Sequence, residues 1–418
     1  MTPEILSLFA PNVALAADGH LTVAGVRAED IAEEFGTPAY VVDEDHLRDR
    51  ARRFESAMRS GWPRGRASWA SKSFPCTAVY RVMADEGLGV DVAGTGELLM
   101  ALAGGVDPAL IIMHGNAKTE AELRRGLDAG VGCIVVDNFD DIDRLERMVD
   151  GEQGVLVRII PGIAPDTHEA ISTGQAGSKF GLELPDARRA VERLRASDKL
   201  RLDGVHVHIG SQILDGEPFA EAVEFVAGLG EFDVYNVGGG LGSRYTYTDR
   251  PPSIEEYVQI ITDGARKLLP ESAQLIIEPG RSMVAETAFT LYRVVTVKPG
   301  TDDAPTFVAV DGGMGDNLEV SLFQQRFEAT MVDRVGGGQS VRLVGRHCES
   351  GDTLIKEIEL DRPAVDDLLA VPVTGAYCHT MSNNYNGALK PPVVFVSQGS
   401  ARAVLRRETY DDLLRRDV

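Results

Sequence analysis

The sequence predicts an α/β protein that combines a closed (β/α)8 barrel of the TIM type, over residues 36–284, with a mostly antiparallel β domain formed by residues 1–35 and 285–418. Two observations lead to this fold class. From residue 66 onward, short apolar runs alternate with amphipathic stretches, and eight such units follow one another in about 215 residues. After residue 285 the helical patterns fade, and short strands separated by turns take their place.

The eight apolar runs are the expected barrel strands. They are "RASWAS" (66–71), "LGVDVA" (88–93), "LIIMHG" (110–115), "CIVVDN" (133–138), "VLVRII" (155–160), "GVHVHI" (204–209), "DVYNVG" (233–238) and "LIIEPG" (275–280). Helical patterns such as "TEAELRRGLDAG" lie between them. Near-continuous apolar strands that alternate with helices are typical of parallel strands buried on both faces, and eight units match a closed barrel better than an open sheet.

The remainder of the chain predicts the second domain. Its expected strands lie in "FTLYRVVTVK", "PTFVAVDGG", "VRLVGRHCESGD", "LLAVPVTGAY" and "PPVVFVSQG". The first 35 or so residues, with "HLTVAGV", precede the barrel and are expected to add strands to this domain.

Composition narrows the classes of function. The 418 residues include 64 Asp and Glu against 42 Lys and Arg, so the formal net charge of −22 disfavours binding to nucleic acid or anionic membranes. The four cysteines lie far apart, and their spacing indicates neither a metal site nor a disulfide framework. No apolar run approaches the roughly 20 residues that span a bilayer. A cytoplasmic protein is expected.

Polar residues and glycine loops follow six of the expected strands, which is where barrels of this type collect their functional groups. They are Lys72, Asp91, His114 with Asn116, His208 before "IGSQ", "NVGGGLG" (236–242) and "EPGR" (278–281). Lys72 is either a lysine that emerges to solvent or a buried amine, with a lowered pKa, that forms a Schiff base with a carbonyl. The two glycine-containing loops offer backbone amides to an anion, although glycines also make tight turns.

Glu278 and His208 complete a chemical pattern. A carboxylate at the barrel mouth is suited to hold a proton on a ring nitrogen, or it forms an ion pair with Arg281. His208 is either a stacking partner for a ring or an ordinary strand histidine. Taken together with Lys72 and the two anion-ready loops, these residues predict a site for pyridoxal 5′-phosphate.

Motifs along the whole chain resemble a known family. They are "ASKSF", "GVDVAGTGEL", "HGNAKTEAEL", "HEAISTGQAGSKFGL", "HVHIGSQI", "NVGGGLG", "IIEPGR", "CESGD" and "GAYCHTMSNNYN". The sequence is similar to the alanine-racemase-type (fold type III) pyridoxal-phosphate enzymes, and within them to the diaminopimelate decarboxylases.

The resemblance implies a role for each matching residue. Lys72 would bind the cofactor covalently, with His208 stacked on its ring and Glu278 at its nitrogen. Asp91 and Glu97 would support the lysine. The phosphate would be held by Ser211, Gly239, Gly240, the amides of Gly280 and Arg281, and Tyr377. Arg281 would also face the polar end of the substrate.

Cys348, in "RHCESGD", would donate the proton that replaces the lost carboxyl group. A thiol with a free pKa near roughly 8.5 is suited to this at neutral pH. In the family, this cysteine and the following glutamate, here Glu349, enter the active site of the neighbouring subunit, so a homodimer with shared sites is implied. From its residue type alone, Cys348 reads as a buried structural thiol.

One segment, "NLEVSLF", departs from the family pattern. Relatives that act on meso-diaminopimelate usually carry an arginine where Glu319 stands and a tyrosine where Phe323 stands. Those two side chains are suited to bind the distal carboxylate of the substrate. Glu319 reverses the charge and Phe323 lacks the hydroxyl, unless Glu319 faces solvent and Arg326 or Arg346 takes over.

The resulting expectation is a decarboxylase of an amino acid whose distal end is not a free carboxylate. Such a substrate is lysine, ornithine or an aminoacyl group on a carrier protein. The alternative is meso-diaminopimelate decarboxylase, which makes L-lysine. An amino-acid racemase is disfavoured because "CESGD" follows the decarboxylases, and an inactive regulatory homologue because Lys72, Glu278 and Cys348 are retained.

Overall fold

The structure is a computed structural model that describes residues 3–163, 177–302 and 304–418. Its contacts divide the chain into two compact units. The barrel unit comprises Arg50–Gly242 and Arg250–Ser282, and the β unit comprises Met1–Asp49, Ser243–Asp249 and Met283–Val418. The domain boundaries at residues 36 and 285 stay a prediction. Most of the motif "HEAISTGQAGSKFGL" lies outside the described residues.

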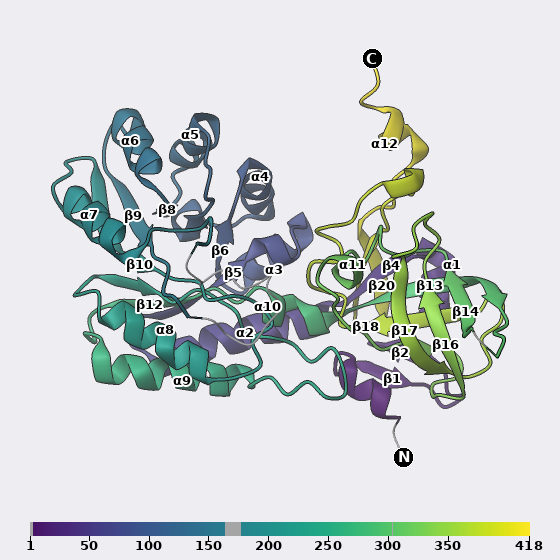
Figure 1. The fold of residues 1–418 in the computed structure, drawn as a ribbon. Coiled ribbons are helices and arrows are strands. Elements are labelled where there is room, and N and C mark those ends of the chain that lie inside the picture. The colour runs from purple at the N-terminus through teal and green to yellow at the C-terminus, as the bar shows by residue number, and fades with distance from the viewer. Residues whose placement is uncertain (1–2, 164–176, 303) are drawn as a thin grey trace. The chain divides into compact units, whose positions relative to one another are not determined.

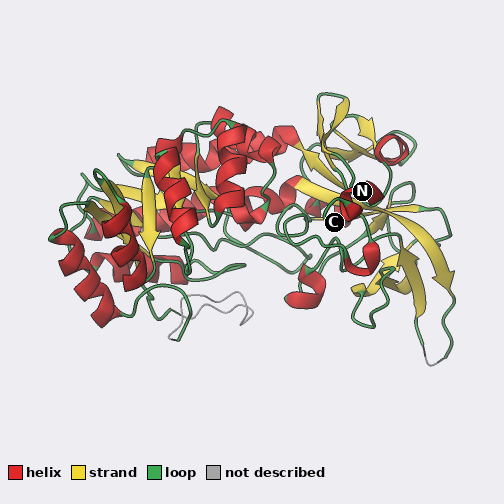
Figure 2. Ribbon diagram, turned by 90° about the horizontal axis from the view of Figure 1, so that it is seen from above, coloured by secondary structure: helices red, strands yellow, loops and turns green. Residues whose placement is uncertain are grey.

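The barrel unit contains the closed parallel barrel that the sequence predicts (Figures 1 and 2). All eight expected strands form, and they close in the order β10-β11-β12-β5-β6-β7-β8-β9. They are β5 (Gly65–Ala70), β6 (Gly89–Val92), β7 (Ile111–Met113), β8 (Cys133–Val136), β9 (Gln153–Arg158), β10 (Leu200–His206), β11 (Val234–Asn236) and β12 (Gln274–Ile277). Ile112, Val135, Leu156 and Ile276 form a shared apolar cluster from four of these strands.

Helices connect the barrel strands. They are α3 (Thr77–Asp85), α4 (Thr95–Gly104), α5 (Glu120–Ala129), α6 (Phe139–Met148), α7 (Leu184–Arg195), α8 (Glu217–Ala227) and α9 (Ile254–Leu268). Two of them begin with a capping box, Thr119 with Glu122 for α5 and Ser253 with Glu256 for α9, which satisfies backbone amides of the first turn. The helices α2 (Glu44–Gly61) and α10 (Arg281–Val284) run across the division between the units.

The β unit is built around a mixed sheet with the order β17-β16-β14-β13-β4-β19-β20, to which β18 and β15 add through β13. The strands are β4 (Ala39–Asp43), β13 (Ala288–Lys298), β14 (Thr306–Val310), β15 (Thr330–Met331), β16 (Gln339–Val344), β17 (Thr353–Leu360), β18 (Leu368–Pro372), β19 (Val393–Ser397) and β20 (Ser400–Leu405). The pairings β14·β16 and β4·β19 are parallel. The other pairings between its described strands are antiparallel, as expected.

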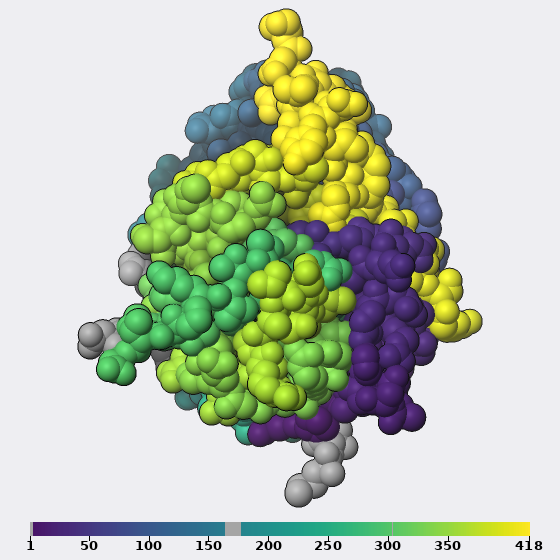
Figure 3. Space-filling model, turned by 90° about the vertical axis from the view of Figure 1, so that its right-hand side faces the viewer, coloured from purple at the N-terminus to yellow at the C-terminus, as the bar shows by residue number. Residues whose placement is uncertain are grey.

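The N-terminal segment adds strands to the β unit, as expected. These strands form a separate three-stranded sheet, β1 (Val13–Leu15), β2 (Leu21–Val23) and β3 (Val26–Arg27). The short turns of this segment let its strands pair with one another, and Leu21 N still donates to Val332 O at 2.8 Å. Figure 3 shows the N-terminal residues (purple) on one surface with C-terminal residues (yellow) of the same unit.

Short helices complete the β unit. They are α1 (Ala28–Phe35), α11 (Glu319–Leu322) and α12 (Tyr410–Leu414). In the part of the chain that the structure describes, we find no helix that is long and apolar enough to cross a membrane.

Candidate active site

The carboxyl ends of the barrel strands bring together a cluster of buried polar side chains. His206 ends β10, Asn236 ends β11, and Glu278 directly follows β12. Asp91 lies in β6, and His114 directly follows β7. Each of the five is at most 8% exposed, so water contributes little to their solvation. Parallel strands of a closed barrel end at the same rim, which explains why residues far apart in the sequence meet here.

Glu278 is the centre of this cluster. Its Oε1 accepts hydrogen bonds from His114 Nε2 at 3.0 Å and Asn236 Nδ2 at 2.7 Å, and its Oε2 accepts one from His206 Nε2 at 3.0 Å. The two histidine rings pack edge to face, with centroids 4.8 Å apart. Both carboxylate oxygens are therefore used, and three side chains fix the orientation of Glu278.

This arrangement keeps Glu278 ionised. Burial by itself would raise the pKa of its carboxyl, but the charges of His114 and His206 and their hydrogen bonds outweigh burial and hold the pKa well below its ordinary value. Burial lowers the pKa of His206 to about 4. For His114 burial also opposes the charged form, but Glu278 outweighs it and the pKa is raised.

The carboxyl groups of Asp91 and Glu97 behave in the opposite way to that of Glu278, because their pKa values are raised. Burial, with the nearby charge of Glu278, raises the pKa of Asp91 to about 7. Asp91 Oδ1 accepts a hydrogen bond from Ser71 N at 3.2 Å, next to Lys72. Burial also raises the pKa of Glu97, whose carboxylate accepts from Ala93 N at 2.6 Å.

Lys72 lies in a short 3-10 helix, Ser71–Ser73, that follows β5. Its side chain is exposed, which agrees with the first of the two sequence-based interpretations, a lysine that emerges to solvent, and not with a buried amine. The physical reason is that the chain turns out of the apolar strand at this point. The charge of Lys72 acts on both His208 and Asp91, so these three groups lie at the same end of the barrel.

The glycine loop after β11 packs against His208 and the backbone after β12. Gly239 N donates to His208 Nδ1 at 3.2 Å, and burial together with the charge of Lys72 lowers the pKa of the His208 ring. A Cβ atom at Gly239 would lie 2.1 Å from the Glu278 carbonyl oxygen, so no other residue fits. Gly240 has a φ of +120°, which favours glycine. On the neighbouring loop, Arg281 Nε donates to Ser211 Oγ at 3.2 Å.

Gly280 also requires close packing, because a Cβ atom there would lie 3.0 Å from Ala70 Cβ.

Sequence reasoning assigned no role to three residues of the barrel mouth, His206, Asn236 and Arg158. Arg158 ends β9, is 9% exposed and places its guanidinium 4.6 Å from the centroid of the Phe180 ring. The available signal was a polar residue at the end of an apolar strand, in "HVH", "YNVG" and "LVR".

The other predicted site residues lie in the β unit. Glu319 begins α11 and is fully buried, and the Tyr245 hydroxyl donates to its Oε2 at 3.5 Å. Phe323 follows the same helix and is half-buried. Cys348 and Glu349 are exposed, so Cys348 is not the buried structural thiol that its residue type suggested. Tyr377 has a φ of +62°, which is uncommon outside glycine.

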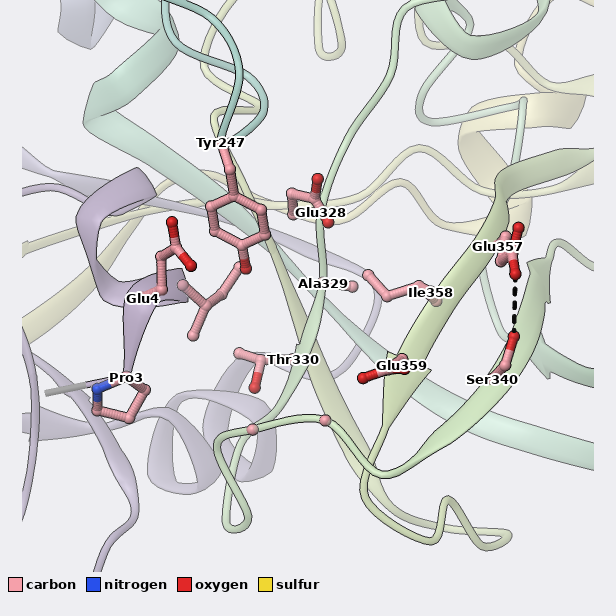
Figure 4. A pocket seen from close by; sticks show the side chains of 13 residues that line it. Pro3, Glu4, Tyr247, Glu328, Ala329, Thr330, Ser340, Glu357, Ile358 and Glu359 are labelled. Atoms are coloured by element: carbon pink, nitrogen blue, oxygen red, sulfur yellow. Dashed lines mark hydrogen bonds between the residues drawn. The ribbon is translucent and has the colours of Figure 1, made fainter. Parts of the chain in front are cut away.

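The β unit also contains an acidic cavity of about 580 Å³ (Figure 4). Glu4, Tyr247 and Glu328 face it on one side, and Glu357 and Glu359 line another part. Burial, with the charges of Glu328 and Glu4, raises the pKa of Tyr247 to about 12. None of the predicted site residues lines this cavity.

The residues of the barrel mouth fit pyridoxal 5′-phosphate. This cofactor presents an aldehyde, a phosphate and a pyridine nitrogen that works best when protonated. The barrel mouth offers an exposed lysine amine, glycine backbone that side chains would block, and an ionised buried carboxylate. In the described residues, His114, His206 and Glu278 are also a group that could hold a metal ion, but both oxygens of Glu278 are already hydrogen bonded.

Comparisons with known proteins agree with this chemistry. A family model described as the pyridoxal binding domain of pyridoxal-dependent decarboxylases matches residues 44–285. Diaminopimelate decarboxylases of Bacillus subtilis and Actinosynnema pretiosum are each 42% identical to the chain over 96% of its length, and the matches cover 95% and 93% of those proteins. That of Mycobacterium tuberculosis is 41% identical over 96% of the chain and 95% of the protein.

Solved structures give the same result. The chain superposes on diaminopimelate decarboxylase of M. jannaschii in complex with L-lysine with a TM-score of 0.90, at 31% identity over 98% of both chains. A lysine/ornithine decarboxylase of Vibrio vulnificus has a TM-score of 0.78 at 23% identity, over 92% of this chain and 100% of the other, and shares the fold. The chain therefore belongs to the pyridoxal-dependent decarboxylases, in the diaminopimelate decarboxylase family, and is a carboxy-lyase that uses pyridoxal 5′-phosphate.

Proposed function

We propose that the chain removes one carboxyl group from meso-diaminopimelate and so makes L-lysine. The names of the relatives, at up to 42% identity over 96% of the chain, support this substrate better than the altered specificity expected from "NLEVSLF". The observation that carries the reaction type is the buried Glu278, which three side chains orient and which His114 and His206 hold in its ionised form.

When bound, pyridoxal 5′-phosphate supplies an electron sink for the electron pair that CO₂ leaves behind. Glu278 would hold a proton on the pyridine nitrogen, and His208 would lie against the ring. Lys72 would hold the aldehyde carbon, and Asp91 and Glu97 would support the lysine. These roles follow the resemblance, and the ionised state of Glu278 supports the first of them.

The remaining residues would act on the phosphate and the substrate. Ser211, Gly239, Gly240, Gly280, Arg281 and Tyr377 would hold the phosphate. Arg281 and Glu349 would contact the substrate, and Cys348 would protonate the carbon that has lost its carboxyl group. Its thiol is exposed, as a donor to an incoming molecule needs to be. We also propose a cytoplasmic homodimer in which each Cys348 serves the site of the other subunit.

A substrate with a different distal end is the second candidate, because of Glu319. Its carboxylate is fully buried beside the Tyr245 hydroxyl rather than directed to solvent. A buried carboxylate favours an amine over a second carboxylate as its neighbour. Lysine, ornithine and a carrier-bound aminoacyl group lack the distal carboxylate of diaminopimelate.

CO₂ release from meso-diaminopimelate, lysine, ornithine and a carrier-bound aminoacyl group decides between the two candidates. If meso-diaminopimelate is the substrate, its kcat/KM exceeds that of the others by at least 100-fold. In the second case this order is reversed, and the double variant Glu319→Arg with Phe323→Tyr gains activity on meso-diaminopimelate. Release from none of the four would contradict both candidates. A carrier-bound substrate would also require a carrier protein as a partner.

A further inference from the structure

We propose that Asp352 is a positioning residue that makes two loops of the β unit move as one element. The first loop, residues 311–318, leads into α11 with Glu319, and the second, residues 345–352, carries Cys348 and Glu349. The inference rests on the proposed function, because it concerns the groups that would select the substrate and protonate it.

The side chain of Asp352 lies between the two loops. It is only 4% exposed. Its Oδ1 accepts a hydrogen bond from Met314 N in the first loop at 2.7 Å, and its Oδ2 accepts one from His347 N in the second loop at 2.7 Å. Charge-assisted hydrogen bonds of this length are about twice as strong as neutral ones. One carboxylate therefore joins both backbones.

Glycines make this approach possible. A Cβ atom at Gly313 would lie 2.5 Å from Asp352 Oδ1, and one at Gly345 would lie 2.2 Å from Asp352 Oδ2. Real Cβ atoms do not approach an oxygen this closely, so the buried carboxylate requires glycine in both loops. The glycines of "DGGMGDN" thus have a structural use other than the phosphate binding that such a pattern otherwise indicates.

Two more contacts join the same loops, and a third joins α11 to the second loop. Gly315 N donates to His347 Nε2 at 3.2 Å, and a Cβ atom at Gly315 would lie 2.5 Å from that nitrogen. Arg346 N donates to Gly312 O at 2.9 Å. From α11 itself, Ser321 Oγ donates to Gly351 O at 3.3 Å. A shift of either loop would therefore break hydrogen bonds to the other.

The geometry thus fixes the proposed proton donor relative to the proposed specificity residues. Cys348 follows His347, whose backbone amide donates to Asp352 and whose ring accepts a hydrogen bond from Gly315 in the first loop. Glu319 begins the helix that the first loop enters. A displaced Asp352 would move both groups at once. We expect this to raise KM and lower kcat together, whereas a change at Cys348 alone lowers kcat.

Amide hydrogen exchange in the cofactor-loaded enzyme tests the coupling without using activity. Asp352→Asn keeps the shape, but its NH2 group cannot accept from a backbone amide, so one of the two bonds is lost. We expect exchange in residues 312–318 and 345–351 to accelerate about tenfold or more in both loops. Gly345→Ala, a change in the second loop, is expected to accelerate exchange in the first. The control, Asp361→Asn, lies directly after β17 with a side chain that is 32% exposed, and is expected to change neither loop.

Acceleration confined to the loop that carries the substitution would overturn the proposal, as would unchanged exchange in Asp352→Asn. Faster exchange throughout the β unit, including β13 and β18, would show a loss of overall stability and would also overturn the proposal that Asp352 couples the two loops. Kinetics add a second readout, in which Asp352→Asn raises KM and lowers kcat by about tenfold each while Cys348→Ser leaves KM within twofold. If the wild type releases CO₂ from no substrate, the proposed function fails, but the exchange result still decides whether the loops are coupled.

Discussion

Replacing Asp91 by asparagine is expected to stabilise the cofactor-free protein, and more so as the pH rises. Burial, with the nearby charge of Glu278, raises the pKa of Asp91 from 3.8 to about 7. Between these two values the folded protein holds a proton that the unfolded chain has released. Stability in the wild type therefore falls as the pH rises from about 4 to about 7, and Asp91→Asn removes this loss because an amide side chain does not ionise.

The size of the effect follows from the pKa. When the pH rises from 5 to 8.5, the free energy of unfolding of the wild type falls only between pH 5 and about 7, the pKa of Asp91 in the folded protein. These two pH units correspond to about 3 kcal/mol at ~1.4 kcal/mol per unit. An unfolding entropy of about 2.1 cal/mol/K per residue converts this into about 3 °C in Tm. The amide oxygen of asparagine can still accept the hydrogen bond that Ser71 N donates at 3.2 Å.

The assay compares the Tm of the cofactor-free wild type and variant by calorimetry at pH 5 and pH 8.5. The difference between the two proteins at each pH isolates Asp91, since His206 and the other groups titrate in both. The exposed Asp150, changed to asparagine, is the matched control and is expected to give the same difference at both pH values. A Tm advantage of Asp91→Asn that stays constant or shrinks towards pH 8.5 would refute the reasoning.

Three further predictions concern the same cluster. Glu278→Gln loses a charged hydrogen bond of about 1.5–3 kcal/mol and is expected to lower kcat about 10- to 150-fold. The control Glu271→Gln changes an exposed residue and is expected to keep the kcat of the wild type. A kcat of Glu278→Gln equal to that of the wild type would contradict this. Lys72→Ala is expected to abolish the visible absorbance band that forms on addition of pyridoxal 5′-phosphate, and a persisting band would exclude Lys72 as its covalent partner. Burial lowers the pKa of His206 to about 4 from 6.5, so its contribution to stability is complete above pH 6.5 and is lost as the pH falls toward 4. The cofactor-free His206→Gln variant should therefore lose less Tm than the wild type between pH 7 and pH 5, and an equal loss would count against the assignment.

The fold was predictable because its strands are continuous in the sequence. The runs from "RASWAS" to "LIIEPG" all form barrel strands, since parallel strands buried on both faces leave a simple apolar pattern. The pairing of the N-terminal strands was not predictable in this way. Their sequence indicates strands, but the choice between joining β4 in the large sheet and forming a separate sheet depends on tertiary contacts.

The candidate site was predictable only in part, for a related reason. Lys72, His208 and Glu278 each had an ordinary structural reading when taken alone, and they indicated a cofactor site only in combination with the two glycine-containing loops. His206 and Asn236 are the last residues of apolar strands, and their role depends on Glu278, which is 72 and 42 residues away in the sequence. Asp352 was missed in the same way, because its partners Met314 and His347 lie in two different loops.

The contacts of Glu278 and those of Glu319 belong to different units of the chain, which explains how the substrate could change while the reaction type remains the same. The hydrogen bonds to Glu278 come from His114, His206 and Asn236, which all belong to the barrel unit. Glu319 belongs to the β unit, and its hydroxyl partner Tyr245 does as well. A substitution at Glu319 therefore leaves every bond to Glu278 in place. The proposed electron-sink chemistry and the proposed substrate selection rest on separate sets of contacts, so a family member can exchange one distal group for another without loss of decarboxylation.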